Sequence, residues 1–199
     1  MMKKFMLTAA VIGSFILPGQ AHADVEKYSF DKAHTQILFF VNHLGFSNSQ
    51  GEFLDYDGHF MIDREAPENS SVEVTIQTAS IDMDDEEWDD HMKNEDFFHV
   101  EKFPTMTFKS TDVELTGENT ANVAGELTLL GVTKPVTLQM THNKSGVHPY
   151  GGKYVAGFSG TTTIKRSEFG MNYGLPAVSD EVQVRIEVEG FREDGEAAE

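Results

Sequence analysis

The chain has 199 residues, with 15 Lys and Arg against 33 Asp and Glu, so its formal net charge at pH 7 is −18. This acidic balance argues against nucleic acid and anionic membrane surfaces as partners, because both need a basic footprint on the protein. The chain has no cysteine, which excludes disulfides, thiolate metal sites and cysteine nucleophiles, while its 15 Phe and 39% hydrophobic content predict a folded chain.

The first 23 residues have the organisation of a secretory signal. Two lysines, Lys3 and Lys4, precede the apolar stretch Phe5–Leu17, and Ala21 to Ala23 form a small-x-small cleavage site before Asp24. The alternative is a retained membrane anchor, but the apolar core is shorter than the roughly 20 residues that a spanning helix needs. We expect cleavage after Ala23 and export to a bacterial periplasm. The mature chain would be a single domain, residues 24–199, and losing the two lysines takes its net charge to −20.

Beyond this segment the dominant hydrophobic period is two, which is typical of strands with one face in a core and one in water. Alternation with this period occurs in Ile37–His43, Val72–Ile76, Val123–Leu129, Val136–Met140 and Val182–Val188. Further strands are expected at Val25–Asp31, Gly51–Asp63, Thr105–Leu115 and Tyr154–Ile164. The pattern predicts an all-β domain of eight or nine strands, with no second domain and no further segment able to insert stably in a membrane.

One acidic segment interrupts the strand pattern. Seven of the nine residues that start at Asp82 are acidic, and none is β-branched. We expect Asp82 or Asp84 to cap one short helix near residues 84–95, with Trp88 and Met92 facing the protein because they are four residues apart. The alternative is a calcium site, but the segment lacks the spacing of an EF-hand loop. A solvated acidic helix is therefore favoured.

Residues that could carry chemistry are few. No nucleophile-elbow, zinc-protease, phosphate-loop or dinucleotide motif is present, and the eight histidines lack the short, regular spacing of metal ligands. The sequence therefore predicts no metal and no cofactor. His43 has the parity of an apolar strand face, so it either contacts the polar end of a ligand or is a buried histidine with backbone or water partners. Asp31 and His34 either form a pair that orients the imidazole or simply make a turn at a strand end.

An ordered set of short motifs covers nearly all of the chain after Ala23. The motifs lie in Tyr28–His34, Phe39–Gly45, Gly51–Phe53, Asp57–Phe60, Ser80–Ile81, His91–Phe98, Phe103–Thr111, Val123–Leu129, Gly131–Leu138, Gly157–Phe158, Arg166–Gly170 and Glu181–Val188. In this order they resemble the YceI-like family of periplasmic polyisoprenoid-binding proteins. Gly131–Leu138 is the most specific of the motifs.

The resemblance implies a lipocalin-like, eight-stranded antiparallel β-barrel with an elongated apolar pore. The family is a binding family, so the resemblance implies no enzyme activity and no catalytic residues. Its ligands are long isoprenoid lipids, such as a polyprenyl quinone precursor or a polyprenyl phosphate. The chain departs from the family pattern in its acidic helix segment, so the resemblance does not extend an anionic-headgroup contact to that helix. The acidic segment is interpreted as serving solubility in a salty medium.

The ligand-binding residues are predicted from strand parity together with the apolar positions of the family. They are Ile37, Phe39, Val41, His43, Phe60, Ile62, Val74, Ile76, Phe108, Leu127 and Leu129. For each apolar member the alternative is ordinary core packing. The alternative function is a lipid-modifying hydrolase or isomerase that uses the same pore, with His43 or Arg166 as polar groups. A structural protein with an empty barrel is a third option.

Overall fold

The computed structural model describes residues 25–193, so the expected signal segment, residues 1–23, lies outside the described residues. The strands are β1 (Glu26–Phe30), β2 (Gln36–His43), β3 (Ser47–Phe53), β4 (Tyr56–Ile62), β5 (Ser71–Gln77), β6 (Ile81–Asp82), β7 (Thr105–Leu115), β8 (Thr120–Leu129), β9 (Val132–Val147), β10 (Tyr154–Lys165) and β11 (Val178–Arg192). The helices are α1 (Glu86–Lys93) and the 3₁₀ turns η1 (Pro67–Asn69), η2 (Thr78–Ser80) and η3 (Arg166–Phe169).

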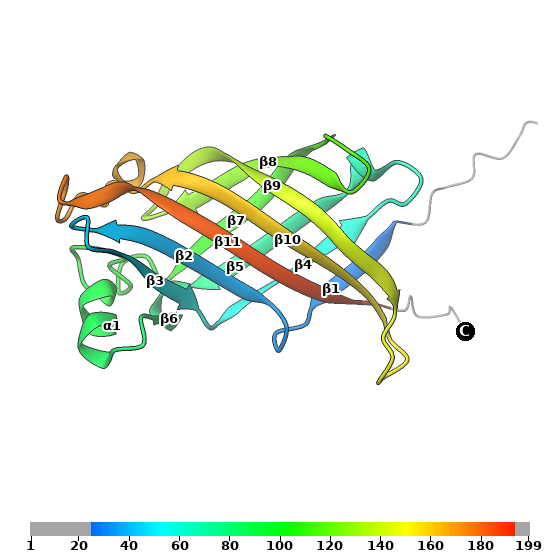
Figure 1. Ribbon diagram of the computed structural model, residues 1–199, viewed down its shortest axis with the longest axis horizontal. Helices are drawn as coiled ribbons and strands as arrows, with labels where there is room; N and C mark the ends of the chain where they lie inside the picture. Colours follow the sequence, from blue (N-terminus) through cyan, green and yellow to red (C-terminus); the bar gives the residue numbers. More distant parts are fainter. Residues whose placement is uncertain (1–24, 194–199) are drawn as a thin grey trace, which may run out of the picture.

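The strands close into a barrel in which all pairs are antiparallel. The ring runs β1-β4-β5-β7-β8-β9-β10-β11 and returns to β1, because β11 pairs with both β10 and β1 (Figure 1). At one end β2 takes the place of β1 beside β11, and β3 and β6 follow it. The expected eight-stranded antiparallel barrel is therefore confirmed.

Three of the eight barrel strands are each broken into two segments, β1–β2, β3–β4 and β5–β6. Gly51–Asp63, expected as one strand, is interrupted at Leu54 and Asp55. The break keeps its backbone hydrogen bonds, because the Leu54 amide donates to Ser80 at 3.1 Å and the Gln77 amide donates to the Asp55 carbonyl at 2.9 Å. The strand therefore bends there while these two backbone amides keep hydrogen-bond partners.

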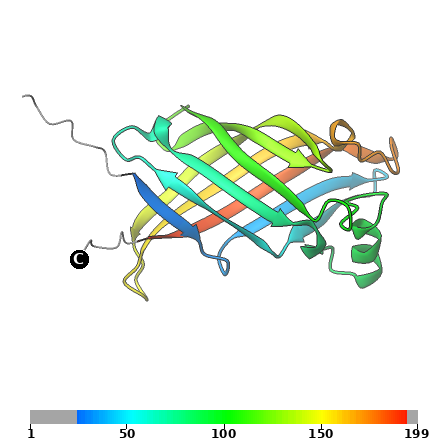
Figure 2. The ribbon, with the colours of Figure 1, turned by 180° about the vertical axis from the view of Figure 1, so that it is seen from behind.

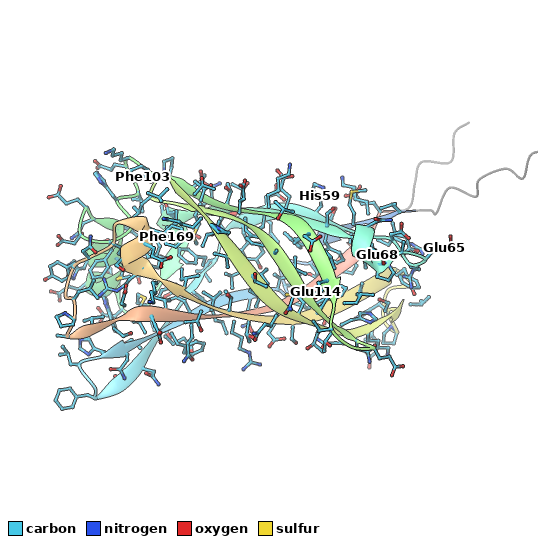
Figure 3. The ribbon with its side chains drawn as sticks, turned by 90° about the horizontal axis from the view of Figure 1, so that it is seen from above. His59, Glu65, Glu68, Phe103, Glu114 and Phe169 are labelled. Atoms are coloured by element: carbon cyan, nitrogen blue, oxygen red, sulfur yellow. The ribbon has the colours of Figure 1, made fainter. Side chains whose placement is uncertain are left out.

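The two ends of the barrel carry different structures. One end, called the α1 end below, holds α1, the β2–β3 turn and the loop that joins η3 to β11 (Figures 1 and 2). The other, called the hairpin end, holds the β9–β10 and β7–β8 turns. In Figure 3, Phe103 and Phe169 mark the first end, and Glu65 and Glu68 mark the second.

Helix α1 has eight residues and is shorter than expected. Its N-cap is Asp85, whose carboxylate accepts from the Trp88 amide at 2.9 Å, so the expectation of a cap at Asp82 or Asp84 was wrong. Asp82 instead accepts from the Asp84 amide at 2.8 Å and forms the turn before the helix. Trp88 and Met92 pack against the core, as expected. Within residues 25–193 no helix has both the length and the apolar character to cross a bilayer.

Candidate ligand-binding cavity

An elongated cavity of about 1150 Å³ lies inside the barrel. Residues from both ends line it, from Trp88 and Tyr173 at the α1 end to Arg64 and Asn119 at the hairpin end. All eleven residues predicted as ligand-binding lie on its wall. Strand parity together with the apolar positions of the family thus selected residues that line the cavity, while their contact with a ligand stays a prediction.

The inward-facing aliphatic side chains are incompletely covered by protein. Ile37, Val74 and Val184 all line the cavity, yet they are only half-buried. A side chain in a filled core is normally enclosed by its neighbours on all sides. These residues face open space on one side, so the barrel interior offers apolar surface that a ligand could cover.

Glycines on neighbouring strands let large aromatic rings lie along the wall. Phe39 is the register partner of Gly51, and a Cβ on this glycine would collide with the Phe39 ring. Gly125 pairs with Ser110 on β7, and a Cβ on this glycine would collide with the ring of Phe108. Both rings belong to the predicted wall. Because the two glycines have no side chains, the rings can lie close against the sheet. The cavity thus stays open although phenylalanines line it.

The α1 end of the cavity is closed around one buried cation. Arg166 is 3% exposed and lines the cavity. Its Nε donates to the Ser179 carbonyl at 2.8 Å, its Nη1 to the carbonyls of Met171 and Tyr173 at 3.2 and 2.8 Å, and its Nη2 to the Val178 carbonyl at 3.1 Å. Burial lowers the pKa of Arg166 from its ordinary value. This side chain holds the loop between η3 and β11 in place.

Aromatic rings surround the same end. The ring of His91 lies 5.0 Å from that of Phe97 and 5.3 Å from that of Tyr173, and the ring of His43 lies 6.4 Å from that of Trp88. All five residues line the cavity. The sequence predicted His43 as a wall residue, but it did not predict His91, Phe97 and Tyr173. The spacing of Trp88 and His91, three residues apart on one helix face, was the available signal.

A charged network closes the barrel seam at the hairpin end. Glu26 accepts from Arg64 at 2.6 Å, from Arg192 at 2.7 Å and from the Tyr28 hydroxyl at 2.7 Å. The two guanidinium groups lie 5.0 and 4.5 Å from the centre of the Tyr154 ring. Burial raises the pKa of Glu26, but its three hydrogen bonds outweigh burial and lower it, while burial and Glu26 raise the pKa of Tyr28 to about 12.

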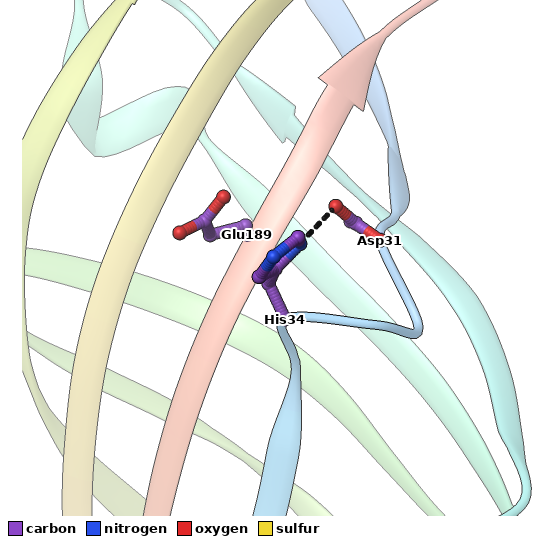
Figure 4. A group of neighbouring side chains, drawn as sticks. All are labelled: Asp31, His34 and Glu189. Atoms are coloured by element: carbon purple, nitrogen blue, oxygen red, sulfur yellow. Dashed lines mark hydrogen bonds and ion pairs between the residues drawn. The ribbon is translucent and has the colours of Figure 1, made fainter. Parts of the chain in front are cut away.

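A second polar cluster lies apart from the cavity, between β1, β2 and β11 (Figure 4). His34 Nδ1 is 2.8 Å from Asp31 Oδ2, and ligand atoms of Asp31, His34 and Glu189 lie within 4.8 Å of one another. The Ala33 amide also donates to Asp31 at 3.0 Å. The hydrogen bond and charge of Asp31 raise the pKa of His34. The two interpretations of Asp31 and His34, as an orienting pair and as a turn at a strand end, are therefore compatible. The Asp31 carboxylate both forms the turn and orients the His34 imidazole.

The arrangement of polar groups on the wall bears on the enzyme alternative. Arg166 donates to backbone carbonyls, and the His43 ring has no hydrogen-bond partner among the described residues. His142 Nε2 and Ser145 Oγ, both on the wall, lie 2.8 Å apart. The histidine of such a pair is commonly oriented by a third group, and within residues 25–193 no carboxylate forms a hydrogen bond or ion pair with His142.

Comparisons with known proteins agree with this architecture. A family model described as the YceI-like domain matches residues 28–190. The chain is 44% identical over 194 residues to a UPF0312 protein of Ectopseudomonas mendocina, covering 96% of this chain and all of the relative. It is 43% identical to a UPF0312 protein of Azotobacter vinelandii with the same coverage.

Solved structures give the same result. Burkholderia cenocepacia BcnA matches with a TM-score of 0.73 and 27% identity, over 80% of this chain and 98% of that one. The Campylobacter jejuni YCEI protein matches with a TM-score of 0.70 and 32% identity, over 77% and 90%. A polyisoprenoid binding domain from Saccharophagus degradans shares the fold, with a TM-score of 0.65 and 14% identity over 83% and 98%. The chain belongs to the YceI-like family.

Proposed function

We propose that this protein binds one long-chain isoprenoid lipid in the barrel cavity and serves as a non-enzymatic carrier or storage protein in the periplasm. The observation that supports this most directly is the continuous apolar cavity of about 1150 Å³. Pockets for drug-sized ligands span roughly 300–1,000 Å³, so this cavity exceeds their usual range. Its elongated form suits a chain better than a compact molecule.

Burial of hydrocarbon alone can supply the affinity. Each buried CH₂ contributes about 0.8 kcal/mol, so a five-carbon isoprene unit contributes at most about 3–4 kcal/mol. Association costs roughly 4–15 kcal/mol in lost freedom of motion, which three or four ordered units would exceed. A ligand of this kind needs no charged contact and no catalytic group, in agreement with the predominantly apolar wall.

The family gives independent support for a lipid ligand. The Saccharophagus degradans domain with the same fold is described as polyisoprenoid binding. The lipid proposed here is of the polyprenyl quinone precursor or polyprenyl phosphate type. A hydrolase or isomerase remains the alternative function, and the His142–Ser145 contact is the observation that favours it.

The periplasmic location rests on the first 23 residues. Their basic start, apolar stretch and Ala-His-Ala site predict a mature chain that begins at Asp24. N-terminal sequencing of the protein from a periplasmic extract tests this. An intact Met1, or a product recovered only with membranes, would contradict the proposed location without affecting the proposed ligand.

Mass spectrometry of the lipids extracted from purified protein tests the binding function. The expected result is about one isoprenoid chain per protein molecule, with unchanged chemical structure after incubation. Failure to extract any isoprenoid, together with failure to bind added polyprenol, would refute the proposal. Conversion of the bound lipid to a product would favour the enzyme alternative, and Ser145→Ala with His142→Gln would identify the groups responsible.

A further inference from the structure

Carboxylates lie on the cavity wall at both ends, with Asp63 and Glu118 toward the hairpin end, and the densest group of them is on α1 at the other end. Asp85 and Glu87 are on the cavity wall, and Glu86, Asp89 and Asp90 lie on the same short helix. The basic groups beside them are few, with Lys93 on the last turn of the helix and the buried Arg166 below it. An anionic headgroup at this end of the cavity would be repelled by these carboxylates, and salt screens such repulsion over about one Debye length, roughly 8 Å at physiological salt.

The same end also offers polar groups that can hold an uncharged ligand group. A guanidinium has five N–H donors, and four of those of Arg166 are taken by backbone carbonyls. His43 is the register partner of Val178, whose carbonyl accepts from Arg166. The histidine, which has no hydrogen-bond partner among the described residues, and the arginine are therefore both neighbours of Val178, and both line the cavity.

The charge of Arg166 is already balanced in part by its surroundings. Four carbonyl dipoles point at its guanidinium, and the Asp180 carboxylate, which accepts from Ser167 at 2.9 and 2.8 Å, acts on it electrostatically. At the hairpin end Arg64 is engaged with Glu26 and Tyr28. Neither end thus presents an uncompensated cation that would select a phosphate.

From these observations we infer that the α1 end holds the polar head of the lipid beside His43 and Arg166, and that this head is uncharged and bears a hydroxyl or carbonyl oxygen. The aromatic rings of Trp88, His91 and Tyr173 cover this head, and the hydrocarbon tail extends toward the hairpin end. A chain that ends in phosphate is rejected by the carboxylates of α1. This inference rests on the proposed function, since it assigns the headgroup class and the orientation of the same ligand.

Trp88 is the only tryptophan in the chain and lines the α1 end, so its fluorescence reports on this end alone. Full-length mature protein, stripped of lipid, is titrated with polyprenol and with polyprenyl phosphate of equal chain length. We expect polyprenol to bind about tenfold more tightly at low salt, and added salt to narrow the difference because the repulsion is screened.

A charge-neutral variant of the helix tests the cause. Glu86→Gln, Glu87→Gln and Asp90→Asn together keep the Asp85 cap and Asp89, which accepts from the Met83 amide. We expect the phosphate to bind about tenfold more tightly to this variant and the affinity for polyprenol to change less than about twofold.

The matched control neutralises three carboxylates at the hairpin end, with Glu65→Gln, Glu68→Gln and Glu114→Gln (Figure 3). This control should leave the ratio of the two affinities unchanged. An effect of the control variant that equals the effect of the α1 variant would overturn the inference.

Two further measurements test the contact and the orientation. His43→Phe should weaken polyprenol binding about threefold to tenfold by removing one hydrogen bond, while His59→Phe, on β4 and outside the cavity wall, should not. A bromine near the hydroxyl should quench Trp88 more than a bromine at the far end of the chain. Stronger quenching from the far end, or equal affinity for both lipids in all variants, overturns the inference. Failure of both lipids to bind refutes the proposed function and the inference together.

Discussion

Replacing Val184 with phenylalanine should fill part of the cavity without disturbing the barrel. Val184 lies on β11 directly across from Phe39, and both side chains line the cavity. The half-buried valine faces open space, so the larger ring can enter the lumen instead of displacing packed neighbours. The stability of the protein should therefore change little, or increase.

The size of the effect on binding follows from the volume added. Phenylalanine has about four carbons more than valine, so the ring takes the place of nearly one isoprene unit of the ligand, and the loss is about 3 kcal/mol at about 0.8 kcal/mol per CH₂. This corresponds to an affinity lower by about 100-fold. Titration with polyprenol, followed through Trp88 fluorescence, measures it.

Gln183→Phe provides the matched control for this variant. Gln183 is the neighbouring residue on β11, faces away from the cavity and pairs with Phe40. The same ring placed on the outside should leave polyprenol affinity within about twofold, because no buried CH₂ contact is lost. A folded Val184→Phe variant with unchanged affinity, or an equal loss in Gln183→Phe, would refute the assignment of the lumen as the binding site.

Three further predictions follow from the wall and the polar clusters. Phe39→Asp should lower bound lipid per protein molecule by about tenfold or more, because an unpaired carboxylate on the apolar wall is costly, provided that circular dichroism confirms the fold and Phe39→Leu retains lipid. Glu26→Gln should lower the free energy of unfolding by about 1–2 kcal/mol at pH 7. The pKa of Glu26 is lower in the folded state, so the stability difference between the variant and the unmodified protein should disappear as the pH falls through the folded-state pKa. A stability difference that persists in acid would contradict the network. NMR titration should give His34 a pKa above 6.5, and this pKa should return toward 6.5 in Asp31→Asn. Because the pKa of His34 is raised in the folded state, the stability that the His34–Asp31 pair contributes should be present at low pH. It should be lost as the pH rises through the folded-state pKa of His34.

Much of the fold could be predicted because a strand's side chains alternate strictly between two faces. Val74 and Ile76 on one strand and Leu127 and Leu129 on another each share a parity, and the barrel turns both sets inward. The helix was located by composition, but its cap was misassigned because three nearby aspartates can each cap a helix. Only the backbone geometry distinguishes Asp85 from its neighbours.

The sequence by itself therefore determined the all-β class, the inward faces of the strands and the position of α1, the one α-helix within residues 25–193, since these depend on local periodicity and composition. Whether the inward residues fill the barrel or surround a cavity depends on the geometry of the strands in the closed barrel. A local sequence pattern does not determine this geometry. The network around Glu26 joins residues up to 166 positions apart, and the meeting of His43 with Arg166 depends on the pairing of β2 with β11. Contacts across such distances in sequence arise only when the barrel closes, so the tertiary structure alone decided which charged and polar groups meet at each end.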